Sequence, residues 1–443
     1  MADSDFSLTR LVGLMASRGC RRIYAKRLSE NDNSKNQVYF GPDFSALNIF
    51  PNMGVRPDEK GAQTFKAGLN FSWIAESEEL YDAPGAQLIF YPQYPEVRMS
   101  GFLKGCRKAP SDLMVGRISK RLLILGVNDE SKIIGYVAPV ESAVSREFEN
   151  FGQLSKVGVF DEIPVDKKGK IGGNNRILLL DELKRIHLLG WIEGKKLRTD
   201  GDCEPCNNSN CGGYTLEAEL GVTPNGYSEP DFLGWEIKQY SVPSFEKITG
   251  SQPITLMTPE PTGGYYQDKG VEAFIRKFGY SDTRGRKDRL NFGGIFRIGQ
   301  PAPKTGLGLV LSGYDPEKNR IVDPEGGINL VSEKKEEAAS WSFASLMKHW
   351  NRKHAQAAYV PSICKSNSIR QYKYGPVVGL GEGTEFLRYL KAMSSGKVYY
   401  DPGIKLEDAS TKPKTKRRSQ FRIKSKDIDI LYARMDWVNV LRE

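Results

Sequence analysis

The fold and function of this 443-residue chain can be inferred by starting from one short stretch, Pro230-Asp-Phe-Leu-Gly-Trp-Glu-Ile-Lys238. The residues up to Asp231 are typical of a turn, whereas residues 232–240 are rich in aromatic and β-branched side chains and predict a strand. Side chains two residues apart on a strand point to the same face, so Glu236 and Lys238 are expected to project together. Asp231 would enter from the preceding turn. Two acids and a lysine at one point predict a site for a hard, oxygen-seeking cation.

These groups fit the hydrolysis of a phosphodiester. Asp231 and Glu236 would hold Mg²⁺, which would polarise the phosphoryl oxygens and help to generate hydroxide. Lys238 would stabilise transition-state charge, or orient and deprotonate the attacking water. The two carboxylates favour its charged form and therefore the first role. The alternative interpretation is an exposed strand with an ordinary charged face, because the pattern is short enough to recur by chance.

A third acid precedes the stretch. Residues 214–220 have the apolar spacing of a short helix. Glu217 on this helix is expected to face the site, whereas Glu219 is expected on the solvent side.

The motif resembles that of a known enzyme group. Three segments resemble motifs of the MvaI/BcnI restriction endonucleases: Thr215-Leu-Glu217, Pro230-Asp-Phe232 and Glu236-Ile-Lys238. Three later segments also resemble segments of that group and occur in the same order: residues 255–262, 341–346 and 421–423. The resemblance extends from about residue 176 to the C-terminus, and only the site motif is specific. It implies a monomeric PD-(D/E)xK nuclease with a mixed sheet flanked by helices. It also implies that Asp231, Glu236, Lys238 and Glu217 form the catalytic site, with Asp231 and Glu236 binding Mg²⁺.

Composition and charge agree with a nucleic-acid enzyme. The chain has 64 Lys and Arg against 54 Asp and Glu, a net charge of +10, and a basic balance favours a polyanionic partner. No apolar run of about 18 residues occurs, so no membrane span is predicted. The N-terminus lacks a secretory signal pattern, and six cysteines without a framework spacing predict a reducing cytoplasm. The length predicts two or three domains.

Residues 1–160 are expected to form one domain. Short segments with strand character are separated by turn residues, which predicts a β-barrel or a sandwich. These segments are residues 38–40, 86–91, 121–126 and 132–137. A helix is expected at residues 6–16. A polar, glycine-rich linker at residues 161–175 would separate this domain from a nuclease domain at residues 176–443.

Two segments of the first domain carry the residue types that contact DNA. Residues 24–37 form a polar arm, and residues 95–101 form a second. Cations contact phosphates, and amide, carboxylate and guanidinium groups read base edges. The DNA-binding candidates are Lys26, Arg27, Ser29, Asn31, Asp32, Asn36, Gln37, Glu96 and Arg98. The alternative is two solvated loops.

The first arm also resembles a known module. Three short segments resemble the N-terminal effector domain of the EcoRII type of restriction enzyme: Lys26-Arg-Leu-Ser29, Asn31-Asp32 and Gln37-Val38. Asn36 stands where a histidine is expected in that group. The resemblance, over roughly residues 10–140, implies a B3-like pseudobarrel that grips DNA between two arms. The expected fold is therefore α/β plus β.

The two resemblances together imply a type II, type IIE-like restriction enzyme. It would cut duplex DNA at a CCNGG-type site, preferring CCWGG, and leave 5′-phosphate ends. A cognate DNA methyltransferase is expected in the same host. Lys416, Arg417 and Arg418 lie where the MvaI/BcnI group reads the major groove with Arg, His and Tyr side chains. The alternatives are a non-catalytic DNA-binding protein and a DNA-repair or RNA-processing nuclease.

Two smaller features stay open or have an ordinary explanation. Cys203, Cys206 and Cys211 have a spacing that suits zinc, but a structural zinc site needs a fourth ligand, and the loop is better explained as an insertion before the helix of Glu217. His349 and His354 are expected on a helical surface at residues 342–353 or just after it, without a catalytic role.

Overall fold

The computed structural model describes the chain outside residues 1–5, 31–35, 43, 45, 59–63, 95, 117, 152–153, 166–170, 172–174, 209, 224–230, 354–355, 367 and 443. Asn31, Asp32, Pro230, His354 and most of the expected linker lie outside the described residues. No helix in the described ranges is long and apolar enough to cross a membrane.

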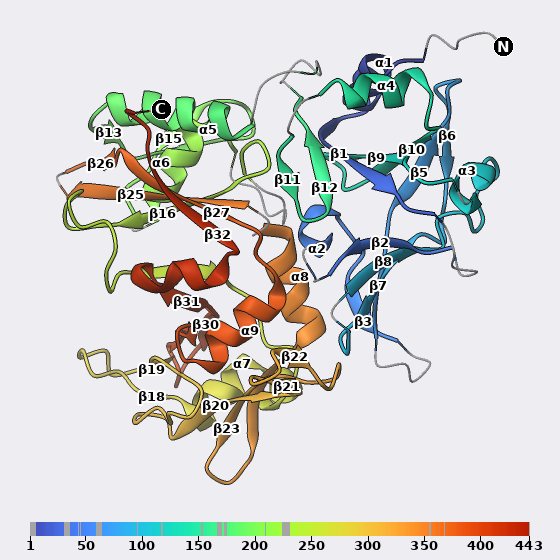
Figure 1. Ribbon diagram of the computed structural model, residues 1–443. Helices are drawn as coiled ribbons and strands as arrows, with labels where there is room; N and C mark the ends of the chain where they lie inside the picture. The colour runs from blue at the N-terminus through green and yellow to red at the C-terminus, as the bar shows by residue number, and fades with distance from the viewer. Residues whose placement is uncertain are drawn as a thin grey trace.

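The N-terminal part is built on a seven-stranded sheet (Figure 1). Neighbouring strands in it pair antiparallel, except that β10 and β5 are parallel. In order across the sheet, the strands are β11 (Lys156–Val157), β12 (Phe160–Ile163), β1 (Cys20–Leu28), β9 (Arg121–Asn128), β10 (Ile133–Ala138), β5 (Phe71–Ile74) and β6 (Leu80–Asp82).

Both faces of this sheet are covered. Ile124 of β9 packs in a core with helices α1 (Leu8–Ser17) and α4 (Ala143–Glu149), whereas Leu123 and Leu125 pack on the opposite side. Alternate side chains of a strand point to opposite faces, so every residue of β9 is buried. The oxygen of Ser7 accepts a hydrogen bond from the Arg10 amide and caps the start of α1.

A second, five-stranded sheet shares the core on that opposite side. Its strands, in order, are β2 (Val38–Gly41), β8 (Glu96–Ser100), β7 (Gln87–Tyr91), β4 (Phe65–Gly68) and β3 (Val55–Pro57), with helices α2 (Ala46–Ile49) and α3 (Ser111–Val115) nearby in sequence. Over the described residues neither sheet closes into a barrel, so of the two expected architectures the sandwich describes this part better. The expected strands and the helix near residues 6–16 are confirmed.

The C-terminal part is organised around a mixed six-stranded sheet. The strands are β13 (Ile192–Glu193), β26 (Arg370–Tyr374), β25 (Gln356–Ser366), β27 (Val377–Glu382) and β32 (Arg434–Asn439), and β16 (Glu236–Ser241) pairs in parallel with β25. Helices α5 (Asn175–Leu188) and α6 (Cys211–Glu219) share an apolar core with one face of this sheet. A second core lies on the other face, with α8 (Phe343–Lys353) and α9 (Phe386–Ser394). The expected mixed sheet flanked by helices is confirmed.

Smaller sheets surround this centre. They comprise β14 (Lys195–Leu197) with β15 (Cys203–Pro205); β17 (Pro253–Met257), β31 (Phe421–Lys424) and β28 (Tyr399–Tyr400); β18 (Tyr280–Ser281), β19 (Arg289–Gly293), β29 (Gly403–Glu407) and β30 (Lys414–Lys416); β20 (Leu307–Ser312), β23 (Gly327–Ser332) and β24 (Glu337–Ser342); and β21 (Tyr314–Asp315) with β22 (Arg320–Ile321). The remaining helices are α7 (Tyr265–Phe278), which is kinked at Gly270, and the 3₁₀ helix η1 (Ser425–Leu431).

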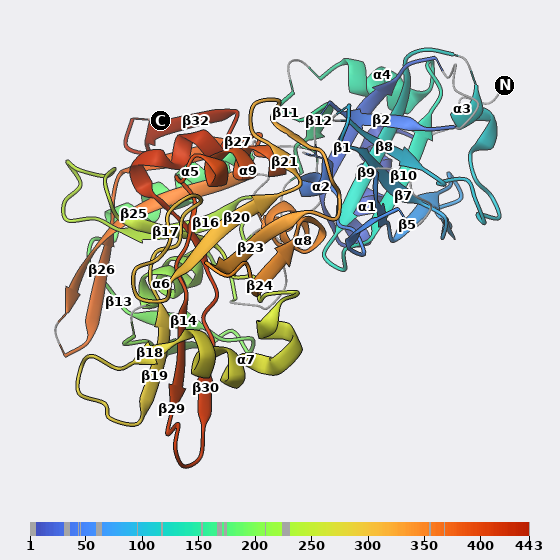
Figure 2. The same cartoon turned by 90° about the horizontal axis from the view of Figure 1, so that it is seen from below.

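The two parts of the chain meet at helix α8. It packs against α2 and β3 of the N-terminal part, and both views place it at this junction (Figures 1 and 2). Strand β12 carries the N-terminal sheet to Ile163, slightly beyond the expected boundary at residue 160, and α5 begins at Asn175.

Candidate active site

A tight turn leads into the strand of the candidate site. The backbones of Phe232 and Trp235 exchange hydrogen bonds of 3.0 and 2.8 Å, and the two residues between them, Leu233 and Gly234, have positive φ angles of 48° and 86°. Glycine adopts this conformation at little cost, which suits its place in the turn. Strand β16 therefore begins only at Glu236, four residues later than the sequence predicts. The turn places Asp231 beside the first residues of the strand.

The three predicted side chains meet at the start of β16. Asp231 Oδ2 accepts a 2.8 Å hydrogen bond from the backbone amide of Ile237, which lies one residue after Glu236. Lys238 Nζ lies 2.5 Å from Glu236 Oε1, so these two side chains share a face as expected. Ile237 points into the core on the other side of the sheet. The expected grouping of Asp231, Glu236 and Lys238 is thus present in the structure.

Burial and the nearby charge of Glu236 perturb the Asp231 carboxylate. Burial, followed by the charge of Glu236, raises the pKa of Asp231 to about 7, despite the hydrogen bond from Ile237 and the charge of Lys238. Burial alone would lower the pKa of Lys238, but the neighbouring acids, Glu236 first, outweigh burial and raise it. Lys238 is therefore an ammonium ion at neutral pH, while Asp231 takes up a proton near neutrality.

One carboxylate oxygen of Glu236 has no hydrogen-bond partner in the described structure. Glu236 is only 2% exposed, and its Oε2 has no hydrogen-bond partner. A buried carboxylate oxygen without a donor is costly, and a cation beside it would remove that cost. Among the described residues, no three His, Cys, Asp or Glu side chains stand close enough to form a complete metal site. Asp231 and Glu236 would thus supply two protein ligands, leaving other positions for water and a phosphate, as is usual for Mg²⁺.

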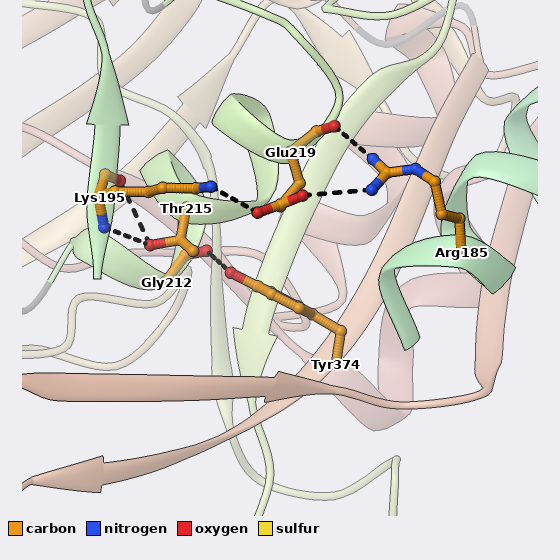
Figure 3. A network of polar contacts seen from close by, with 6 residues as sticks. All are labelled: Arg185, Lys195, Gly212, Thr215, Glu219 and Tyr374. Atoms are coloured by element: carbon orange, nitrogen blue, oxygen red, sulfur yellow. Dashed lines mark hydrogen bonds and ion pairs between the residues drawn. The ribbon is translucent and has the colours of Figure 1, made fainter. Parts of the chain in front are cut away.

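Helix α6 carries the third expected acid, Glu217, to a cavity that Lys238 also lines. The helix is fixed by two hydrogen bonds drawn in Figure 3. The Lys195 amide donates to Thr215 Oγ1 at 3.0 Å, and the Tyr374 hydroxyl donates to the Gly212 carbonyl at 2.7 Å. Both contacts hold α6 against β14 and β26, so they determine where Glu217 lies.

Glu219 corrects one expectation from the sequence. Its side chain is 10% exposed and forms ion pairs with Lys195 Nζ at 2.6 Å and Arg185 Nη1 at 3.4 Å (Figure 3). Instead of facing solvent, Glu219 joins α6 to α5 and β14. The spacing of acids along a helix could not show this, because both cations come from other elements.

The cysteine loop before α6 holds a disulfide. Cys206 and Cys211 are bonded, and Cys203 is exposed and free. The zinc site that the spacing left open is not formed, because two of its three cysteines are joined to each other. The remaining free cysteines are Cys20, Cys106 and Cys364. A disulfide was not expected from the predicted reducing environment.

Glu217 and Lys238, but not Asp231 or Glu236, are among the residues that line a cavity of about 590 Å³. Its lining also includes residues of β17 and Arg422. Arg422 donates to Thr255 Oγ1 at 3.1 Å and pairs with Asp401 at 2.8 Å. The sequence signal for Arg422 was its strand, residues 421–423, but no role was assigned to it.

His349 also lines this cavity, contrary to the expectation of an ordinary helical surface. It lies on α8, more than a hundred residues after β16. No motif connects the two segments in the sequence. Only the packing of α8 beside the catalytic sheet brings His349 to the cavity.

The N-terminal DNA-binding candidates are divided by the structure. Lys26, Ser29, Asn36, Gln37 and Arg98 line one hollow of about 240 Å³. The two predicted arms converge there because β2 and β8 pair, with Tyr39 opposite Arg98.

Two candidates from the same arms are held by neighbouring side chains. Glu96 pairs with Arg98 at 3.0 Å. Arg27 does not line the hollow: it pairs with Glu149 at 3.0 Å and Asp161 at 3.6 Å, and its guanidinium lies over the ring of Phe148. The predicted phosphate contact of Arg27 would compete with these interactions.

The C-terminal basic candidates lie in a separate sheet. Lys416 ends β30 and pairs with Glu407 at 2.9 Å, and Lys416, Arg417 and Arg418 are exposed. Strand β30 joins β29, β19 and β18, so this sheet also carries the basic residues 284–289. Burial, and then the charge of Arg289, lower the pKa of Lys405 on β29. None of the three candidates lines the catalytic cavity.

The chain is similar to one known family of proteins and to solved structures of restriction endonuclease MvaI. The sequence profile of the MvaI/BcnI restriction endonuclease family matches residues 180–432. A solved complex of restriction endonuclease MvaI with a cognate DNA substrate is 17% identical, covering 60% of this chain and 99% of that chain at a TM-score of 0.44. MvaI in the absence of DNA is 16% identical, covering 61% and 99% at a TM-score of 0.33. No curated protein matches the chain.

Proposed function

Because the chain belongs to the MvaI/BcnI restriction endonuclease family, we propose that it is a Mg²⁺-dependent type II endonuclease that hydrolyses duplex DNA at a short specific site. The observation that carries this proposal is the unpartnered, buried Glu236 Oε2, on a carboxylate that pairs with Lys238, which lines the cavity. That arrangement suits a divalent cation and a phosphate.

The donor set fits Mg²⁺. Asp231 and Glu236 offer only oxygen ligands, and no thiolate or imidazole accompanies them in the described part of the chain. The proton that Asp231 holds near neutrality would leave when the cation binds, since a ligating carboxylate must be ionised. Bound there, Mg²⁺ would supply a Lewis acid that neutralises phosphate charge.

The protein's own groups would share the remaining work. The Lys238 ammonium is fixed by Glu236 and would stabilise the charge that develops on the phosphate, because its raised pKa disfavours a role as base. Glu217, on the helix fixed by Thr215, would hold the attacking water. Arg422, which lines the same cavity, would contact the DNA backbone.

The finer features of the proposal rest on the resemblances in the sequence. We propose a CCNGG-type target with CCWGG preferred, and products with 5′-phosphate ends. The protein would act as a monomer in the cytoplasm, and a cognate methyltransferase would protect host DNA. The N-terminal part would be a B3-like effector that binds DNA through the hollow lined by Lys26, Gln37 and Arg98. Binding of a second site there would raise cleavage by increasing the effective concentration of DNA.

Cleavage of plasmid DNA tests the proposal. With Mg²⁺, the full chain should give defined fragments whose ends map to CCWGG and carry 5′-phosphates, and Asp231→Ala should abolish them. Equal cleavage by Asp231→Ala would refute the assignment of the site. Tight DNA binding without cleavage under any divalent ion would favour a non-catalytic DNA-binding protein. Preferential cleavage of RNA or single-stranded DNA would indicate a processing or repair nuclease.

A further inference from the structure

Helix α8 connects the catalytic cavity with the N-terminal part of the chain. Its buried side chains Phe343, Leu346, Met347 and Trp350 belong to the large apolar core that also contains Leu47, Phe50 and Val55 of the N-terminal part. The helix packs directly on α2 and β3. One element therefore contacts the expected effector part and also contributes to the lining of the active site.

The polar side of α8 faces the other way. Lys348 and His349 are exposed, and of these two only His349 lines the cavity with Glu217, Lys238 and Arg422. Directly after α8 the chain enters β25, in which Ala357 pairs with Glu236 and Tyr359 with Lys238. A shift of α8 would therefore displace both His349 and the strand next to the catalytic strand.

The two cations that are proposed to act on phosphate in this cavity are each shared with an acid. Lys238 pairs with Glu236 at 2.5 Å, and Arg422 pairs with Asp401 at 2.8 Å. Glu217 adds negative charge to the lining. DNA is a polyanion, so a further hydrogen-bond donor in the lining would strengthen its binding, and an imidazole N–H is such a donor.

We propose that His349 binds a phosphate of the DNA in the catalytic cavity, and that the packing of α8 on α2 and β3 sets its position. This inference rests on the proposed nuclease function and names one of its DNA-binding residues. It also supplies a physical route by which the state of the N-terminal part alters DNA binding at the active site, because α8 is a single packed helix that touches both.

Variants of the full chain test the first half of the inference. We expect His349→Ala to raise the KM for plasmid, and the Kd for duplex DNA measured with Ca²⁺ in place of Mg²⁺, by about 3–10-fold, with kcat within about twofold. His349→Arg keeps a cationic donor and should recover most of the affinity. Lys348→Ala is the matched control, since Lys348 is the exposed neighbour outside the cavity lining. Unchanged KM and Kd in His349→Ala would overturn the proposal.

A double-mutant cycle tests the second half. Val55→Ala truncates a buried side chain of β3, the strand that packs on α8, and should raise Kd by about 2–5-fold in the wild type but have no further effect in His349→Ala. Val137→Ala is the control, because it removes equal volume from the same core at β10, a strand of the other N-terminal sheet. Equal effects of both valine variants, or full additivity with His349→Ala, would disprove the link through α8. Because Kd is measured without cleavage, this result stands even when the wild type fails to cut DNA.

Discussion

Lys238 and Glu236 form the closest ion pair of the candidate site, with Nζ 2.5 Å from Oε1, and this pair leaves Glu236 Oε2 buried and unpartnered in the described structure. The two oxygens of one carboxylate thus have different roles. Oε1 fixes the lysine, and Oε2 is the atom that would contact the proposed cation. The geometry therefore separates the proposed role of Lys238 from that of the proposed metal ligands.

Replacement of Lys238 tests this separation. We expect Lys238→Ala to lower single-turnover cleavage by about 10²–10³-fold, the usual loss when a preorganised donor to transition-state charge is removed. Its half-saturating Mg²⁺ concentration should stay within a few-fold of wild type, because Asp231 and Glu236 remain. Glu236→Gln should instead raise the Mg²⁺ requirement strongly. The same Mg²⁺ shift in both variants would show that Lys238 acts through the metal site.

The pKa of Asp231 predicts a pH-dependent metal requirement. Burial and Glu236 raise this pKa to about 7, so Asp231 is mostly protonated below neutrality. Mg²⁺ must then displace a proton, and its apparent affinity should fall up to about tenfold for each pH unit below 7 and level off above pH 8. The measurement is the half-saturating Mg²⁺ concentration for cleavage between pH 6 and 8.5. A requirement that does not change across this range would contradict the predicted ionisation.

The spatial grouping of the candidate-site residues Asp231, Glu236 and Lys238 was predictable from the sequence because they are close together along it. A turn followed by a strand puts Asp231, Glu236 and Lys238 at one point whatever the rest of the chain does. The start of the strand was predicted too early, since the aromatic residues Phe232 and Trp235 favour a strand by composition but flank a turn here. Local propensity could not show that the backbone reverses at Leu233 and Gly234.

Residues that reach the site from distant segments could not be found in this way. His349 joins the cavity only because α8 packs beside the catalytic sheet, and the partners of Glu219 come from α5 and β14. The same limit applies to the N-terminal arms. From their residue type, Arg27 and Arg98 were both predicted to contact DNA. In the structure, ion pairs with Glu149 and Asp161 hold Arg27 away from the hollow.

The Cys206–Cys211 disulfide should stabilise the start of α6. The first turn of this helix contains Gly212 and Gly213, which are poor helix formers, and Asn210 provides no side-chain hydrogen bond at its start. After reduction with a dithiol, we expect faster hydrogen exchange at residues 211–217 and weaker cleavage at limiting Mg²⁺, because Glu217 lies on this helix. A Cys206→Ser, Cys211→Ser variant should resemble the reduced protein and no longer respond to the dithiol. Equal exchange in the oxidised and reduced proteins would refute this role.

Arg98 and Arg27 form a matched pair for testing how the N-terminal part binds DNA. Both were expected to contact DNA, but only Arg98 lines the hollow, whereas Arg27 is fixed by Glu149, Asp161 and the ring of Phe148. In the proposed effector role, Arg98→Ala should weaken binding of the specific duplex by about 1–3 kcal/mol and relax discrimination at one base position. Arg27→Ala should change DNA affinity by less than about 0.5 kcal/mol, since Arg27 lies outside the hollow and its guanidinium is held by Glu149 and Asp161.

Competition binding of specific and single-substituted duplexes, followed at several salt concentrations, checks the prediction for this pair. Loss of a phosphate contact alone would lower affinity equally for every duplex and reduce the salt slope by about one. A base contact would change the ranking of the duplexes. Equal losses in both variants would mean that charge, and not the hollow around Arg98, governs DNA binding by the N-terminal part.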